Sequence, residues 1–111
     1  MSDYENLAVL FDAADPQTEA EKVLIAAHWL QKQSGAPNIE AAAVNRELKH
    51  LGHAVRNVTM AFNVLLGDRP ALVVQMAKSG NTKQARKKYM VTRAGEKYLQ
   101  QMLARAGGGN E

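Results

Sequence analysis

The densest group of chemically active side chains is a run of basic residues late in the chain. Six cations fall within sixteen residues, with no acid between Asp68 and Glu96: Lys78, Lys83, Arg86, Lys87, Lys88 and Arg93. Duplex DNA carries one negative charge per roughly 1.7 Å of axis, so a protein that holds it needs several cations on one surface. Lysines also block edge pairing on surface hairpins, but six cations exceed that need. We expect this segment, with Gln84 as a neutral donor, to contact phosphates, and Arg86 to enter the minor groove.

A second group lies on a helix that we expect at residues 54–66. Val55, Val58, Phe62 and Leu65 recur at helical spacing and would face the core. At about 100° per residue, the opposite face then carries Arg56, Asn57, Met60 and Asn63, with Thr59 at its border. Arg can bind guanine through two hydrogen bonds, Asn can bind adenine, and Met or Thr can contact a thymine methyl group. This pattern predicts a base-reading helix, although an ordinary polar face stays open as the alternative.

Other chemistry finds little support in the sequence. Glu47, His50 and His53 are spaced by threes, as metal ligands on one side of a helix would be, but Gly52 interrupts the helix between the two histidines. We therefore expect no metal site and no cofactor. The chain has no nucleophile elbow, P-loop or glycine-rich phosphate motif, and no cysteine. We expect no catalytic residues, and the protein is not predicted to be an enzyme.

Helical patterns fill the first part of the chain. A short helix is expected within residues 1–14, and a second from Thr18 to about residue 33, where the Thr18 hydroxyl accepts from the Glu21 amide and Glu21 reaches back to the Thr18 amide. Gly35 would end it. A short extended piece at 37–39 leads to a helix at 40–51, in which Asn45, Arg46 and Lys49 are possible phosphate contacts.

The pattern changes after the helix at 54–66. Gly67, with a positive φ, and Pro70 would end that helix. Residues 71–77 alternate as a strand, a turn follows near Gly80, and residues 85–92 return as a second strand. Thr92 would cap a last helix, whose apolar stripe is Tyr98, Leu99, Met102 and Leu103.

This order of elements, with two short helices joined near Gly52 and a hairpin directly after the second, resembles the winged-helix superfamily of bacterial transcription regulators, of the MarR or PadR kind. The resemblance is carried by residues 44–52, 58–66 and 88–95. It implies an α+β, mainly α fold: a winged helix-turn-helix domain at residues 18–105, after an N-terminal arm or short helix at 1–17 and before a disordered tail at 106–111. The second helix at 54–66 would enter the major groove, and the wing at 71–92 would follow the backbone or minor groove.

Charge divides the chain in a way that fits a polyanionic partner. Residues 1–40 hold seven acids and two lysines, whereas residues 41–111 hold twelve basic residues and four acids. The first ten residues contain no basic residue, so we expect no signal peptide, and no apolar run is long enough to cross a membrane. The absence of cysteine suits a reducing compartment. A cytoplasmic location is the expectation.

The sequence therefore predicts a sequence-specific regulator that binds double-stranded DNA. We expect a homodimer through the terminal helices, whose apolar stripes include Leu7, Leu10 and Phe11 at one end and Tyr98 and Leu99 at the other. Burial of these stripes in their own core is the alternative. A winged-helix adaptor that binds protein in a larger assembly is the alternative function, and RNA binding is a weaker third. Nothing in the sequence indicates an effector ligand.

Overall fold

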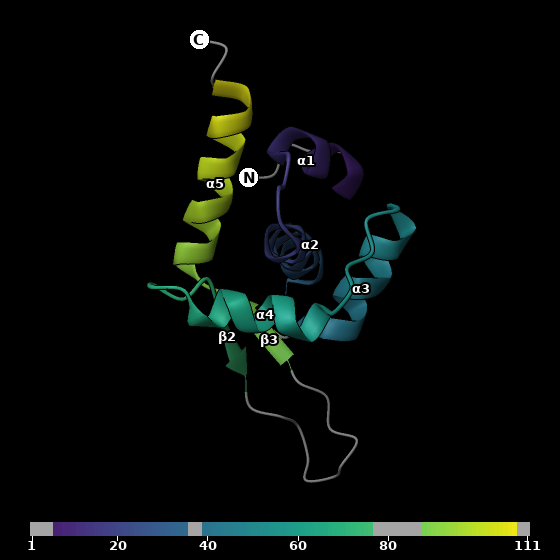
Figure 1. The fold of residues 1–111 in the computed structure, drawn as a ribbon, viewed down its shortest axis with the longest axis vertical. Coiled ribbons are helices and arrows are strands. Elements are labelled where there is room, and N and C mark those ends of the chain that lie inside the picture. Colours follow the sequence, from purple (N-terminus) through teal and green to yellow (C-terminus); the bar gives the residue numbers. More distant parts are fainter. Residues whose placement is uncertain (1–5, 36–38, 77–87, 109–111) are drawn as a thin grey trace, which may run out of the picture.

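The computed structural model describes residues 6–35, 39–76 and 88–108. Within them the chain forms an α+β, mainly helical fold, in which a small antiparallel sheet lies among the helices (Figure 1). This layout is compatible with a winged helix. The elements in chain order are α1 (Leu7–Ala14), α2 (Glu19–Ser34), β1 (Ile39–Glu40), α3 (Ala41–His50), α4 (Val58–Gly67), β2 (Val73–Met76), β3 (Lys88–Val91) and α5 (Arg93–Gly108).

Helix α2 is the centre of the core. In Figure 1 it is seen end-on, with α1, α3, α4 and α5 arranged around it, and it contacts each of them as well as β3. Five consecutive residues of α2 are almost completely buried: Val23, Leu24, Ile25, Ala26 and Ala27. A helix covered on one side would bury a single stripe, so this continuous burial follows from neighbours on several sides.

The start of α2 confirms half of the predicted capping box. The Thr18 hydroxyl accepts a hydrogen bond from the Glu21 amide at 3.1 Å. The Glu21 carboxylate, however, accepts from the Gln17 amide at 2.7 Å and not from Thr18. The other oxygen of the same carboxylate accepts from the Tyr98 hydroxyl of α5 at 2.7 Å, so Glu21 joins the start of α2 to α5. Gly35 ends the helix in the left-handed conformation, as predicted.

The sheet has the order β1–β3–β2, with both pairs antiparallel. Helix α4 crosses over β2 and β3 (Figure 1). Phe62 of α4 stacks on Tyr89 of β3 with ring centroids 4.0 Å apart. Tyr89 and Val91 are both buried, which confirms that they share the inner face of the returning strand. At their described ends, β2 begins at Val73 and not at residue 71, and β3 ends at Val91 and not at residue 92. The turn expected near Gly80 falls within 77–87, outside the described residues.

The prediction of a helix from residue 54 is wrong. Residues 54–57 are not helical. Asn57 is the N-cap of α4 with an extended backbone, and its side-chain oxygen accepts from the Met60 amide at 3.0 Å. Val55 is buried, as expected of a core residue, but from the segment between α3 and α4. Gly67 does not adopt a positive φ either: it is the last helical residue, and the chain leaves α4 through an extended Asp68.

The terminal helices pack against each other and against α2. Their apolar residues are buried within the same chain, which is the alternative to a dimer contact for these stripes: Leu7, Leu10, Phe11, Leu99 and Met102. The Thr92 hydroxyl accepts from the Gly95 amide at 3.0 Å and so caps α5, as predicted. Helix α5 extends to Gly108, so it includes residues 106–108 of the segment where a disordered tail was expected.

Candidate nucleic-acid interface

The outer face of α4 is an exposed and uncharged surface. Ala61, Phe62 and Leu65 face inward and are buried. The residues on the other side are exposed, as predicted for Thr59, Met60 and Asn63. Val64 joins them: its side chain is 53% exposed and that of Met60 is 61% exposed. We call Thr59, Met60, Asn63 and Val64 the α4 outer face.

The sequence prediction did not include Val64, whose apolar side chain is of the same kind as those of the core residues around it. The 100° spacing that placed Met60 outward puts Val64, one turn later, on the same side. Phe62 and Leu65 define the buried side, and Val64 lies well away from Phe62. The spacing of residues along the helix therefore predicts the exposed position of Val64.

The segment before α4 brings Arg56 and Asn57 to the N-terminal end of the outer face. Both residues are exposed, but neither lies within the helix as predicted. The side-chain oxygen of Asn57 is engaged in the N-cap bond, so this residue positions α4 and only its amide nitrogen is left to donate. The Arg56 backbone amide donates to the Glu19 carboxylate at 3.2 Å, which ties this segment to the start of α2.

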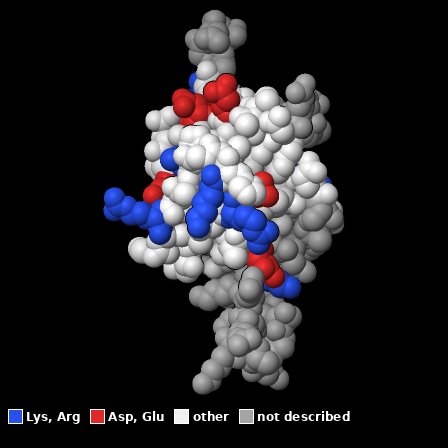
Figure 2. All heavy atoms as spheres, turned by 90° about the vertical axis from the view of Figure 1, so that its right-hand side faces the viewer, with Lys and Arg blue, Asp and Glu red and all other residues white. Residues whose placement is uncertain are grey.

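Positive charge gathers beside this region. Figure 2 faces the side on which α3 lies in Figure 1 and shows Lys and Arg side chains in a band across the middle of the molecule. Helix α3 contributes the exposed residues Arg46 and Lys49. Asn45 fits a phosphate contact less well, since its side-chain oxygen is buried without a hydrogen-bond partner in the described part of the chain.

Of the residues predicted to form the wing contacts, the structure describes Lys88. Lys88 lies at the start of β3 and is partly buried. The remaining expected contacts fall outside the described residues: Lys78, Lys83, Gln84, Arg86 and Lys87. The two strands on either side of this segment, β2 and β3, pair with each other beneath α4. The cationic segment therefore starts and ends at the sheet that carries α4.

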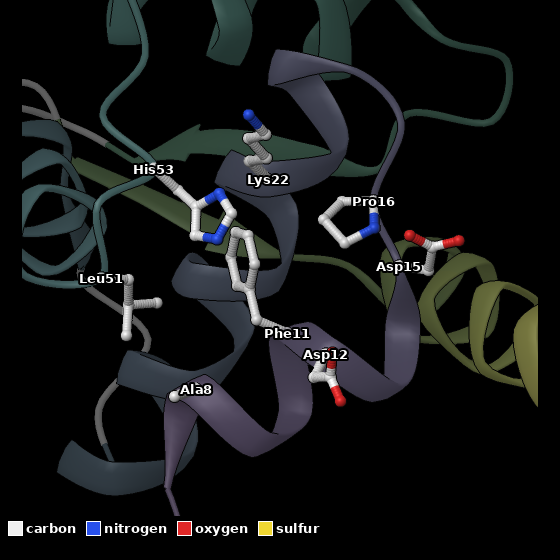
Figure 3. Close-up of a pocket in the computed structure, with 8 residues that line it drawn as sticks. All are labelled: Ala8, Phe11, Asp12, Asp15, Pro16, Lys22, Leu51 and His53. Atoms are coloured by element: carbon white, nitrogen blue, oxygen red, sulfur yellow. The ribbon is translucent and has the colours of Figure 1, made fainter.

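A cavity of about 270 Å³ lies away from the α4 outer face, between α1 and the segment that joins α3 to α4. Figure 3 shows the rings of Phe11 and His53 side by side in its centre, with centroids 4.7 Å apart. Lys22 of α2 lies on one side of these rings and Pro16 on another (Figure 3). The cavity thus combines an aromatic surface with charged groups near its rim.

The histidines do not form a metal site in the described ranges, where no three acidic or histidine side chains come together to hold an ion. His53 contacts Phe11 instead of the side of α3 that carries Glu47 and His50. His28 is partly buried in α2, and this burial lowers the pKa of its imidazole. Among the described helices, none is long and apolar enough to span a bilayer.

Comparison with known proteins adds no relative: no family model, no curated protein and no solved structure matches the chain. The functional interpretation therefore depends on the chemistry and placement of the residues described above.

Proposed function

We propose that this protein binds double-stranded DNA with sequence preference, as a winged-helix regulator. In this proposal α4 enters the major groove, and the cationic segment between β2 and β3 forms a wing along the backbone or minor groove. The observation that carries the proposal is the α4 outer face, which is exposed, free of charge and rich in groups that match base edges.

The arrangement of elements supports this placement. Helices α3 and α4 follow each other with a connection of seven residues, 51–57, which is longer than the turn of a minimal helix-turn-helix. Helix α4 is anchored from behind by the stacking of Phe62 on Tyr89, so its opposite side is turned outward. A reading helix needs this combination of a packed inner face and an unobstructed outer face.

Charge supports the same partner. The phosphate backbone is the main source of affinity for DNA, and phosphates are bound by Lys and Arg. The exposed cations Arg46, Lys49 and Arg56 come from α3 and the segment that precedes α4, and the segment 77–87 adds four more in sequence. The outer face itself holds no acid that would repel phosphates. A cytoplasmic location, which suits a cysteine-free chain, and a homodimer belong to this proposal.

A second function is favoured by one observation. Met60 and Val64 are large apolar side chains exposed one turn apart on α4, and such a pair also suits a protein partner. The alternative is a winged-helix adaptor that docks α4 on another protein. Charge distinguishes DNA binding from the adaptor function, since a surface that docks on protein is expected to have fewer cations around it.

Binding of the full chain to labelled random-sequence duplexes, measured by fluorescence anisotropy, tests the proposal. The triple change Lys83→Ala, Arg86→Ala and Lys87→Ala should weaken binding to all sequences alike, because phosphates carry no sequence information. Changing Asn63 or Arg56 to Ala should instead alter the preference between sequences, by roughly 1–3 kcal/mol per lost bidentate contact.

A matched pair of single changes controls for net charge. Arg86→Ala and Lys97→Ala each remove one cation, but Lys97 lies on α5, exposed and outside the proposed surface. Arg86→Ala should weaken binding more than Lys97→Ala. Equal losses would mean that affinity reflects net charge alone. Absence of binding to any duplex would overturn the proposal and favour the adaptor.

A further inference from the structure

We infer that α4 selects A·T base pairs, with Met60 and Val64 contacting thymine methyl groups and Asn63 hydrogen-bonding adenine. This inference rests on the proposed function and names the class of sequence that the same surface reads. It starts from an unusual distribution of apolar side chains. In the described part of the chain three large apolar residues stay exposed, Val9, Met60 and Val64, and two of them lie on α4.

These two residues face the same direction. Residues four apart lie one above the other on one side of a helix, so Met60 and Val64 form a continuous apolar surface. In the major groove, the C5 methyl group of thymine is the apolar feature by which a base pair is told apart, and the minor groove shows no such group. An exposed apolar pair on a groove-facing helix therefore complements thymine.

The polar groups of α4 point to the same base pair. No residue from Val58 to Gly67 is charged. Guanine is read mainly by Arg or Lys on its O6 and N7 atoms, and the cytosine amino group by Asp or Glu. Helix α4 offers neither kind of side chain. It offers the exposed amide of Asn63, which matches the N6 and N7 atoms of adenine.

The spacing along the helix fits neighbouring base pairs. Four residues rise about 6 Å along a helix axis, and two base-pair steps rise roughly 7 Å. Met60 and Val64 can then reach thymines about two steps apart, with Asn63 close to Val64 along the helix. The cations nearest in sequence, Arg56 and Arg69, lie just before and just after α4, so a guanine contact from either residue would fall at an edge of the site.

The test compares three pools of labelled duplexes of equal length in an anisotropy titration of the full chain. One pool has a random A·T centre, one a random G·C centre, and one repeats the A·T pool with uracil in place of thymine. Uracil keeps every hydrogen bond and removes only the methyl group. We expect tighter binding to A·T than to G·C, and about a tenfold loss on uracil, the size expected for two buried methyl groups.

Variants then assign the effect to α4. The double change Met60→Ala and Val64→Ala should remove the difference between thymine and uracil, whereas Met60→Leu with Val64→Ile should keep it. Asn63→Ala should reduce the preference for A·T over G·C by about tenfold. The control is Val9→Ala, which shortens a valine on α1 that is 42% exposed, and it should keep both differences. All these side chains are exposed, so the thermal midpoint should not change.

The outcomes separate this inference from the proposed function. If duplexes bind but thymine and uracil bind alike, A·T selection through methyl contacts is overturned and DNA binding stands. A thymine preference that survives the double alanine change, or that Val9→Ala also abolishes, likewise overturns the role of α4. If no duplex binds, the proposed function fails as well, and the exposed pair on α4 points to a protein partner.

Discussion

Gly95 is held so tightly that no larger residue fits. It lies in the first turn of α5, where an added Cβ would collide with the Leu72 carbonyl oxygen and come within 2.8 Å of Val91 Cγ1. We expect Gly95→Ala to lower the free energy of unfolding by about 1–3 kcal/mol, because backbone and a packed valine would have to move. Urea denaturation followed by circular dichroism measures this. Gly67→Ala is the control, since nothing lies within 4 Å of the added atom, and it should be neutral or slightly stabilising.

Glu21 is the charged residue whose side chain lies deepest among the described residues. Its carboxylate accepts hydrogen bonds from the Gln17 amide and from the Tyr98 hydroxyl, both at 2.7 Å. Arg105 approaches the same carboxylate at 3.8 Å, but the arginine is more than half exposed and solvent screens this pair. The Tyr98 bond therefore joins α2 to α5 more firmly than the ion pair does.

This bond makes stability depend on pH at the alkaline end. The hydrogen bond to Glu21 and, after it, burial raise the pKa of Tyr98 above its usual value. The unfolded chain then loses its tyrosine proton first, so stability is fully present below about pH 10 and falls as the pH rises further. Tyr98→Phe should lower stability at neutral pH by about 1–2 kcal/mol and make the alkaline fall less steep. An unchanged slope in urea titrations across this range would contradict the assignment; buried Tyr89 accounts for a remaining slope.

At the scale of elements, two exposed asparagines have different roles: Asn57 lies just before α4 and Asn63 lies within it. Asn57 caps the helix, whereas Asn63 lies on the outer face. We expect Asn57→Ala to cost about 1 kcal/mol of stability, since the Met60 amide loses its partner. Asn57→Ser, which can cap, should restore most of this loss, and Asn63→Ala should leave the thermal midpoint unchanged. Equal losses from the two alanine changes, in thermal melts, would show that the cap is not the cause.

Much of the order of helices and strands could be predicted from the residues that cap or end helices. Thr18, Gly35, Gly52 and Thr92 begin or end elements where expected, because capping and positive φ need only local chemistry. The start of α4 could not be predicted in this way. Val55 continues the helical spacing of the residues that follow it, yet it is buried from a non-helical segment. The spacing of apolar residues indicates which side chains are buried, but it does not show whether the backbone at each of them is helical.

Contacts between residues far apart in the sequence account for other differences between the predicted and the observed structure. Local capping chemistry predicts a bond from the Thr18 amide to Glu21, but it cannot predict the bond from Tyr98, which lies 77 residues further along the chain. Of the predicted site, Thr59, Met60 and Asn63 are exposed on α4 as expected, Arg56 and Asn57 precede the helix, and Val64 was missed. The predicted wing contacts from 78 to 87 lie outside the described residues and stay predictions.

At the scale of the whole molecule, DNA binding should depend strongly on salt. If the wing, α3 and the start of α4 neutralise about five phosphates per subunit, log affinity falls against log salt with a slope near −4.5, roughly −0.9 for each phosphate. Anisotropy titrations over a series of salt concentrations measure the slope. A nearly flat response would contradict a phosphate-binding surface, and Lys83→Ala should make the slope shallower by about one.

Assembly is constrained by the packing of the chain ends. Because most apolar residues of α1 and α5 are buried against each other and α2, a dimer through these helices would use the exposed Val9 and the half-buried Tyr98 and Leu103, or displace α1. Sedimentation equilibrium with and without duplex DNA determines whether two copies associate and whether a two-fold operator is needed.

One hydrogen bond between α2 and the sheet supplies a partner for the backbone at the end of β3. Within the described residues, strand β1 pairs with β3 at Tyr89 and Lys88. At the end of β3, the Thr92 amide donates toward Leu72, and the preceding amide, that of Val91, donates to the Gln31 side chain at 2.9 Å. Gln31 therefore gives this backbone donor an acceptor and joins the central helix to the last residue of β3. Since a donor left unsatisfied inside a protein costs about 1–3 kcal/mol, one side chain of α2 holds the end of the strand in place.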